Sequence, residues 1–356
     1  MHPYTGKPDY QFWKKAGGLD TPSSLDPVTA VSFRIGKRDR VLTAGSCFAQ
    51  HVARRLSENG FNYFVSERAH PLIPEATARA NNYGVFSARY GNVYTARQMK
   101  QLLQRAWGQH EPVETAWRLD DGTFVDPFRP QVQPGGFVSA DELLVDRRQH
   151  LAAVRKGIDK MAVFVFTLGL TEAWIDRRDG SVFPLAPGVA GGTFDPDLFE
   201  FVNFSVNDTL NDMRWIVKFI RKRNPDCRII LTVSPVPLNA TAMDRHVLVS
   251  TAYSKSVLRV VAEDVCSSFE MCDYFPSYEI ITSPHAGGAY FADDRRSVTE
   301  AGVDHVMGLF LRHYGDTSDT APAAKTDDER DASDKHFREM ENVVKVLCDE
   351  EAIDNT

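Results

Sequence analysis

A glycine, a hydroxyl and a thiol follow one another where a strand should give way to a helix. Val41–Ala44 is a short apolar run, and after Gly45 apolar residues recur at every fourth position through Leu56, which is typical of one buried helix face. Ser46 and Cys47 should therefore lie at or near a helix N-terminus, where the macrodipole and free N–H groups stabilise a thiolate or an oxyanion. A cysteine in such a place can act as a nucleophile, although most cysteines are simply small buried residues.

The elements that must position this turn can be predicted from hydrophobic patterning. Apolar, β-branched runs predict buried strands at 161–168, 228–233 and 272–275, with a short strand at 61–64. Helical periodicity predicts helices over 95–107, 207–223 and 247–268, and Thr299 can cap another. Strands separated by helices favour parallel strands with crossover connections, a three-layer α/β/α sandwich.

Ligands of a parallel α/β sheet bind outside the carboxyl ends of its strands. Four such ends carry polar residues, and we expect them to meet at one edge: Gly45–Cys47, Gly169–Glu172, Ser234–Pro237 and the segment from Phe275 to Asp294. Three long irregular stretches, 69–93, 112–136 and 179–201, are the length of lids or binding walls.

Charge and composition narrow the class of protein. The chain of 356 residues has a formal net charge of −7, and the part from Gly315 onward has 13 acidic and 5 basic residues, which leaves the rest near neutral. This balance argues against nucleic acid or an anionic membrane as partner. We predict no signal sequence and no membrane span, and five scattered cysteines without a C-x-x-C pair favour a reducing, cytoplasmic setting without a metal site.

We expect a body, a linker and a terminal helix. Residues 1–314 form the α/β domain, 315–336 a polar acidic linker, and 337–356 a C-terminal helix and tail. The apolar stripe of that last helix could dock on the body or on a protein partner.

The Gly-Ser-Cys-Phe-Ala run at 45–49 resembles the motif of the GSCFA family. Further blocks fit the same family across about residues 1–314, at 90–95, 167–174, 234–235, 254–255 and 274–279. The family is similar to the SGNH/GDSL hydrolases, so the resemblance implies a flavodoxin-like sandwich with a parallel sheet and the chemistry of esterases and acyltransferases. These hydrolases use a Ser-His-Asp site.

The resemblance assigns roles position by position. Cys47 stands where the SGNH nucleophile belongs, with Ser46 where an aspartate would be, and we favour Cys47 over Ser46 as nucleophile. The SGNH block Gly-x-Asn-Asp is matched by Gly169 to Glu172, with Thr171 replacing the oxyanion-hole asparagine. The second-block donors are matched by the glycine and asparagine at Gly91 and Asn92.

The last SGNH block departs from the pattern. Asp294 begins it, but Ser297 occupies the place of the histidine, and a serine cannot act as a general base at neutral pH. Arg296 between them could bind a carboxylate or phosphate. If a base exists it must come from elsewhere; the candidates are His246, His285 and His51.

Two functions follow as expectations. The first is acyl transfer or ester hydrolysis on a carbohydrate or other polar substrate, through a covalent acyl intermediate on Cys47 or Ser46, with Glu172 or Asp294 and a histidine managing protons. A thiol nucleophile favours transfer from a thioester such as acyl-CoA, and no cofactor is predicted. The alternative is a degenerate member that binds a glycan or polar ligand without turnover.

Overall fold

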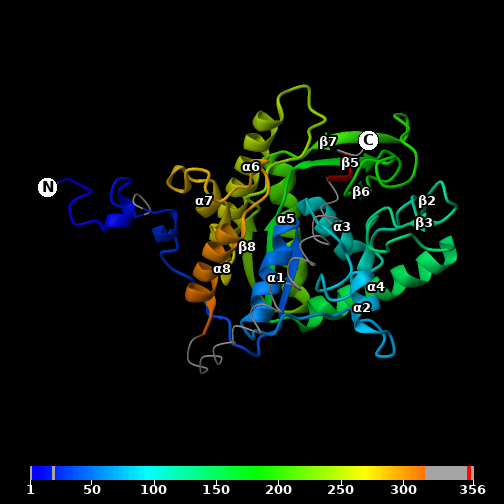
Figure 1. Cartoon of the computed structure of the whole chain (residues 1–356), viewed down its shortest axis with the longest axis horizontal. Helices are drawn as coiled ribbons and strands as arrows, with labels where there is room; N and C mark the ends of the chain where they lie inside the picture. The colour runs from blue at the N-terminus through cyan, green and yellow to red at the C-terminus, as the bar shows by residue number, and fades with distance from the viewer. Residues whose placement is uncertain (1, 18–20, 317–350, 354–356) are drawn as a thin grey trace.

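The centre of the protein is a parallel sheet of four strands. The computed structural model describes residues 2–17, 21–316 and 351–353, and its main sheet comprises β1 (Val41–Gly45), β4 (Val163–Leu168), β8 (Arg228–Val233) and β9 (Cys272–Tyr274). The strand order is β1-β4-β8-β9, and every pair is parallel. The predicted parallel topology is therefore confirmed (Figure 1).

Helices cover both faces of this sheet. One face packs against α1 (Phe48–Glu58), α7 (Ser277–Thr282) and α8 (Glu300–Tyr314). The other packs against α3 (Ala96–Ala106), α4 (Ala140–Lys160), α5 (Val206–Arg223) and α6 (Val247–Ser268). This is the expected three-layer α/β/α sandwich, with α4 as a helix that the sequence patterns did not reveal.

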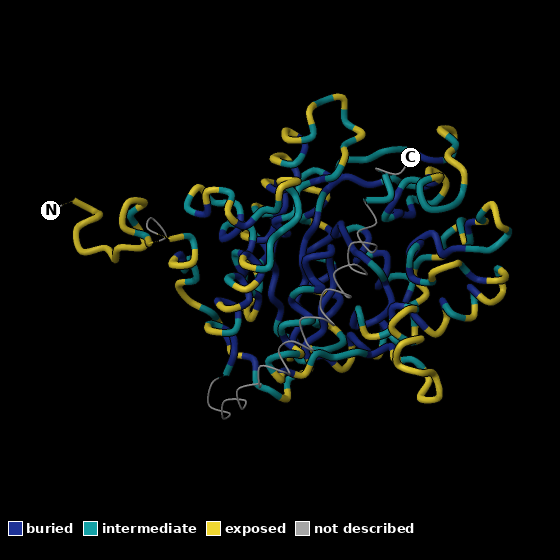
Figure 2. The backbone as a smooth tube through the Cα atoms, in the orientation of Figure 1, coloured by how far each residue is buried: buried dark blue, intermediate teal, exposed yellow. Residues whose placement is uncertain are grey.

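The central strand β4 shows why these runs form the sheet. All six of its residues are buried, so it reads as a continuous apolar run rather than an alternating one. Phe164 and Phe166 pack on the α3–α6 side, whereas Val163 and Val165 pack on the α1–α8 side. The two cores in this way share one strand, and Figure 2 shows that the buried backbone gathers at the middle of the molecule.

The stretches expected to be irregular contain small elements of their own. Residues 112–136 hold the hairpin β2 (Trp117–Arg118) and β3 (Phe124–Val125), and 69–93 hold α2 (Glu75–Ala80). A second, antiparallel sheet is built from β5 (Glu172–Asp176), β6 (Val182–Phe183) and β7 (Phe199–Asn203). The prediction of a strand at 61–64 was wrong, because Tyr63 pairs with Val41 by a single parallel bridge.

The N-terminal part of the described chain lies outside the sandwich. The N-terminal arm, with the 3-10 turns η1 (Asp9–Gln11) and η2 (Pro22–Ser24), extends away from the body and is largely exposed (Figure 2). The predicted linker beyond 316, and most of the predicted terminal helix, lie outside the described residues. Among the helices that the structure does describe, none is both long and apolar enough to cross a membrane.

Candidate active site

The Gly-Ser-Cys turn is fixed against the end of the central strand. Gly45 has φ +141°, and a Cβ at this position would lie 2.3 Å from the Thr167 carbonyl oxygen, so no other residue fits. The Ser46 N–H donates to the same carbonyl over 3.3 Å. The turn therefore enters the helix at a position set by β4.

The two side chains of the turn lie at the positive end of α1. Cys47 is the N-cap residue of this 11-residue helix, and the carbonyls of Ser46 and Cys47 accept hydrogen bonds from Ala49 and Gln50 in its first turn. Ser46 is 3% exposed, and within the described chain its hydroxyl has no hydrogen-bond partner. A buried hydroxyl without a partner is rare in folded proteins. The Ser46 hydroxyl can therefore form a hydrogen bond with a bound ligand.

Ser46 and Cys47 line a small cavity that is partly open to solvent. The ends of β1, β4 and β8 meet in it, as the parallel topology requires. Its other lining residues are Tyr94, Gly169, Leu170, Ser234, Val236, Pro237, Leu238 and Lys255.

Gly169 brings the next strand end into direct contact with the turn. A Cβ on this residue would lie 3.0 Å from the Tyr94 carbonyl oxygen and 3.2 Å from the Ser46 Cβ. The N–H groups of Gly169 and Leu170 both donate to that Tyr94 carbonyl, over 3.0 and 3.1 Å. The predicted site residue Gly169 is thus a close-packing position beside Ser46.

A buried lysine is the functional candidate that the sequence patterns missed. Lys255 of α6 is 2% exposed, and its Nζ donates to the Gly169 carbonyl oxygen over 2.6 Å. The signal was present, because Lys255 shares the spacing of Leu258 and Ala262 on the buried face of the helix. An ammonium group in a cavity with a thiol favours the thiolate, because opposite charges stabilise one another in a low dielectric.

The opposite wall of the cavity offers no free backbone donors. Pro235 and Pro237 have no N–H. The N–H of Val236 donates to the Ser234 hydroxyl and that of Leu238 to the Thr251 hydroxyl, each over 3.3 Å. This wall therefore has no free backbone donor for a bound ligand.

Thr171 and Glu172 are engaged in contacts of the second sheet. The Thr171 hydroxyl donates to the Asn203 side chain over 2.7 Å, and its N–H donates to the Ser254 hydroxyl. Glu172 begins β5 and accepts a hydrogen bond from the Thr241 hydroxyl over 2.8 Å. Both directly follow Gly169 and Leu170, which line the Cys47 cavity, but neither of them lines it.

Asp294 organises its own loop before α8. Its carboxylate accepts hydrogen bonds from the N–H groups of Arg296 and Ser297, and from the Ser297 hydroxyl over 2.6 Å. Slight burial opposes ionisation, but these hydrogen bonds outweigh it and lower the pKa of Asp294. Arg296 lies 3.8 Å from the Glu351 carboxylate of the C-terminal segment.

Each of the three candidate histidines makes a contact that supports the fold. His246 is exposed and caps α6, where its Nδ1 accepts from the Leu248 N–H. The ring of His285 packs against Trp13 at a centroid distance of 4.9 Å. His51 packs against Phe48, and burial together with the neighbouring arginines lowers its pKa to about 3.

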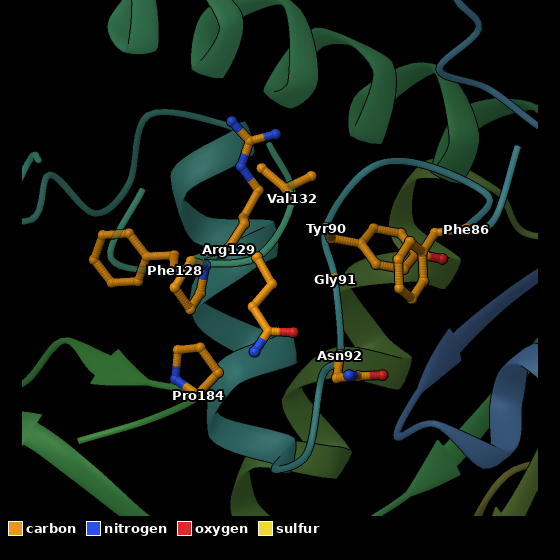
Figure 3. Close-up of a pocket in the computed structure, with 10 residues that line it drawn as sticks. Phe86, Tyr90, Gly91, Asn92, Phe128, Arg129, Val132 and Pro184 are labelled. Atoms are coloured by element: carbon orange, nitrogen blue, oxygen red, sulfur yellow. The ribbon is translucent and has the colours of Figure 1, made fainter. Parts of the chain in front are cut away.

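Gly91 and Asn92 belong to a neighbouring cavity. Figure 3 shows the segment that carries them on one side of this cavity and Phe128 and Pro184 on the other, with the Asn92 side chain directed away from those two residues. Asn92 is 3% exposed, and its side-chain oxygen accepts from Gln50 of α1 over 3.3 Å. The Val93 N–H donates to the Gly45 carbonyl, so this segment is the wall between the two cavities.

Two solved structures share low similarity with the chain. One is a family 3 carbohydrate esterase from Clostridium thermocellum, with 10% identity, a TM-score of 0.33, and coverage of 78% of this chain and 95% of that one. The other is a putative platelet activating factor from Streptococcus pneumonia, with 15% identity, a TM-score of 0.27, and coverage of 48% and 65%.

No curated protein matched the chain. The model of the GSCFA family matches residues 40–310, which span the Gly-Ser-Cys turn, all four strands of the main sheet and most of α8. The match covers well over half of the sequence. This protein therefore belongs to the GSCFA family.

Proposed function

We propose that this protein transfers or hydrolyses acyl esters of a carbohydrate or another polar substrate through an acyl intermediate on Cys47. The observation that carries the proposal is the single cavity that holds Ser46, Cys47 and Lys255 at the start of α1. A nucleophile, a hydroxyl donor and a proton carrier are the groups that acyl transfer requires.

Acylation begins with the Cys47 thiolate, stabilised by the α1 dipole and the Lys255 ammonium. Its sulfur forms a bond to the carbonyl carbon of the ester, and the carbonyl electrons move to oxygen. When the tetrahedral intermediate collapses, the C–O bond breaks and the leaving alkoxide takes a proton from Lys255. The products of this half-reaction are an acyl thioester on Cys47, a free alcohol and a neutral Lys255 amine.

Deacylation reverses these roles. The Lys255 amine takes a proton from water or from an acceptor hydroxyl, whose oxygen attacks the thioester carbonyl. The C–S bond breaks, and the thiolate and ammonium are regenerated. Water as acceptor gives hydrolysis, whereas a sugar hydroxyl gives transfer, and a thioester donor such as acyl-CoA could load Cys47 by the same step.

The Ser46 hydroxyl is the donor that best suits the oxyanion. It is buried beside Cys47 and has no competing partner in the described chain, unlike the Thr171 hydroxyl, which donates to Asn203. One such donor typically contributes about 10²–10³ to the rate. Glu172, Asp294, His246 and His285 have no step in this mechanism.

The test compares two cysteines in one protein. Iodoacetamide should label Cys47 at pH 7 far faster than Cys227, because burial raises the pKa of Cys227 to about 12. Cys47→Ala should remove p-nitrophenyl acetate turnover by about a thousandfold or more, whereas Cys227→Ala should leave turnover intact. Equal labelling of the two thiols, or full turnover in Cys47→Ala, contradicts the proposal.

A second candidate is binding without turnover. The observation in its favour is Ser297, which closes the Asp294 turn where a catalytic histidine would stand. The same cavity would then hold a polar ligand as a lectin-like site. Saturable binding of an acylated sugar, with no acyl-enzyme detected by mass spectrometry after incubation with p-nitrophenyl acetate, would support this alternative.

A further inference from the structure

A cavity on the far side of the 91–94 segment contains an arginine that is not paired with any carboxylate of the described chain. It is a small cavity, partly open to solvent, between α3 and the loop that follows β3. Tyr90, Asn92, Phe128 and Arg105 are among its lining residues. It adjoins the cavity of Figure 3, with which it shares Tyr90, Asn92, Phe128 and Arg129.

Arg105 differs from the other arginines of this region. Its guanidinium stacks on the Phe128 ring at 3.9 Å, and its buried Nε has no hydrogen-bond partner within the described residues. The neighbouring arginines are all bonded to carboxylates over 2.6–2.9 Å: Arg89 to Asp146, Arg129 to Asp126 and Asp146, and Arg147 to Asp126.

The carboxylates near Arg105 do not balance the positive charge of its guanidinium. Burial lowers the pKa of Arg105 to about 9, Asp126 opposes this shift, and Arg147 and Arg129 add to it. Asp126 is already shared by those two arginines. The guanidinium remains a cation at pH 7, so an anion entering the cavity would meet uncompensated positive charge.

We propose that this cavity binds the carboxylate of an acidic ligand, with Arg105 as the anion-binding group. A planar guanidinium matches a carboxylate with two parallel hydrogen bonds, so a small carboxylic acid is the class of ligand that this cavity would take.

The position of the cavity connects it to the acyl site. The Val93 N–H donates to the Gly45 carbonyl over 2.8 Å, and Tyr94 lines the Cys47 cavity. A ligand held at Arg105 is thus one chain segment away from the reacting turn. That the bound acid is the substrate itself, such as a uronic acid ester, rests on the proposed function; the binding of a carboxylate at Arg105 does not.

Binding is measured by calorimetry in low-chloride buffer, with the full chain carrying Cys47→Ala so that turnover plays no part. The probes are D-glucuronate, acetate, inorganic phosphate and uncharged D-glucose. We expect the two carboxylates, D-glucuronate and acetate, to bind more tightly than inorganic phosphate and D-glucose. Arg105→Gln should weaken glucuronate binding at least tenfold, and Arg105→Lys should weaken it less because the charge remains.

The matched control is Arg223→Gln. Arg223 also stacks on an aromatic ring, Phe219 at 3.5 Å, but it lies at the end of α5 and not in this cavity. The control should bind glucuronate as the parent does. Unchanged affinity in Arg105→Gln, no glucuronate binding by the parent, or preference for phosphate or glucose overturns the proposal. If Arg105→Gln fails to fold, the Arg105→Lys measurement decides, since parental affinity there contradicts the assignment.

Discussion

Two buried polar regions of this protein differ in whether their polar groups are paired with one another. The first, which we call the ionic cluster, lies on and around α4. It consists of Glu67, Arg89, Asp126, Arg129, Asp146, Arg147 and His150. Its members bond to one another, as in the pairs Arg129–Asp126 at 2.9 Å and His150–Glu67 at 2.7 Å. The second is the Cys47 cavity, where the buried Ser46 hydroxyl has no partner within the described chain.

The difference separates groups that hold the fold from groups available for chemistry. Burial opposes the ionisation of Asp126, but Arg147 and Arg129 outweigh burial and hold its pKa well below the usual range. A carboxylate stabilised in this way is committed to its partners and is a poor acid or base at neutral pH. In the Cys47 cavity, by contrast, hydrogen-bonding capacity is left for a ligand.

The largest expected effect comes from breaking the ionic cluster. Asp126→Asn removes one charge and leaves two buried arginines without it, so we expect the free energy of unfolding to fall by about 3–5 kcal/mol. Urea denaturation measures this change. Asp304→Asn is the control, because Asp304 pairs with Arg55 at the surface and is 61% exposed, and its effect should stay below about 1 kcal/mol. Equal losses in the two variants would contradict the contrast between a buried and an exposed ion pair.

A smaller effect, on reactivity rather than stability, is expected at Lys255. Lys255→Met removes the charge that favours the Cys47 thiolate, so iodoacetamide labelling of Cys47 should slow about tenfold at pH 7, and its pH midpoint should move upward. Lys255→Arg should retain part of the rate. Lys218→Met on α5 is the control, since Lys218 is exposed. A labelling profile for Lys255→Met that coincides with the parent's would exclude Lys255 from the mechanism.

A third variant tests the close packing of the cavity. Gly169→Ala places a methyl group 3.0 Å from the Tyr94 carbonyl oxygen, so we expect a loss of about 1–3 kcal/mol in stability together with reduced turnover. Gly308→Ala in α8 has nothing within 4 Å and should instead stabilise the helix by about 0.5–1 kcal/mol. Thermal unfolding compares the two, and stabilisation by Gly169→Ala would show that the turn has room to relax.

Most of the sandwich could be predicted because its elements carry strong local patterns. Residues 228–233 form β8 and 247–268 form α6 as expected, since the apolar run and the helical period lie within each segment. The antiparallel sheet of β5, β6 and β7 was not predicted, because two of its strands are short or partly exposed and are defined by pairing across the chain.

The candidate site was only partly predictable for a related reason. Ser46, Cys47 and Gly169 follow directly from strand ends, and topology alone brings strand ends together. The direction of a side chain one or two residues later does not follow from topology. Glu172, the first residue of β5, accordingly accepts a hydrogen bond from Thr241 in the loop before α6, whereas Lys255, in the middle of a long helix, lines the cavity.

The proline-containing wall of the Cys47 cavity has a consequence for selectivity. With every N–H from Val236 to Leu238 absent or already bonded, that wall can distinguish acyl groups by size and contour but not by hydrogen bonding. Discrimination between a short and a branched acyl chain would then depend on the two aliphatic side chains, Val236 and Leu238. Trimming either one to alanine is the direct route to a protein that accepts bulkier acyl groups.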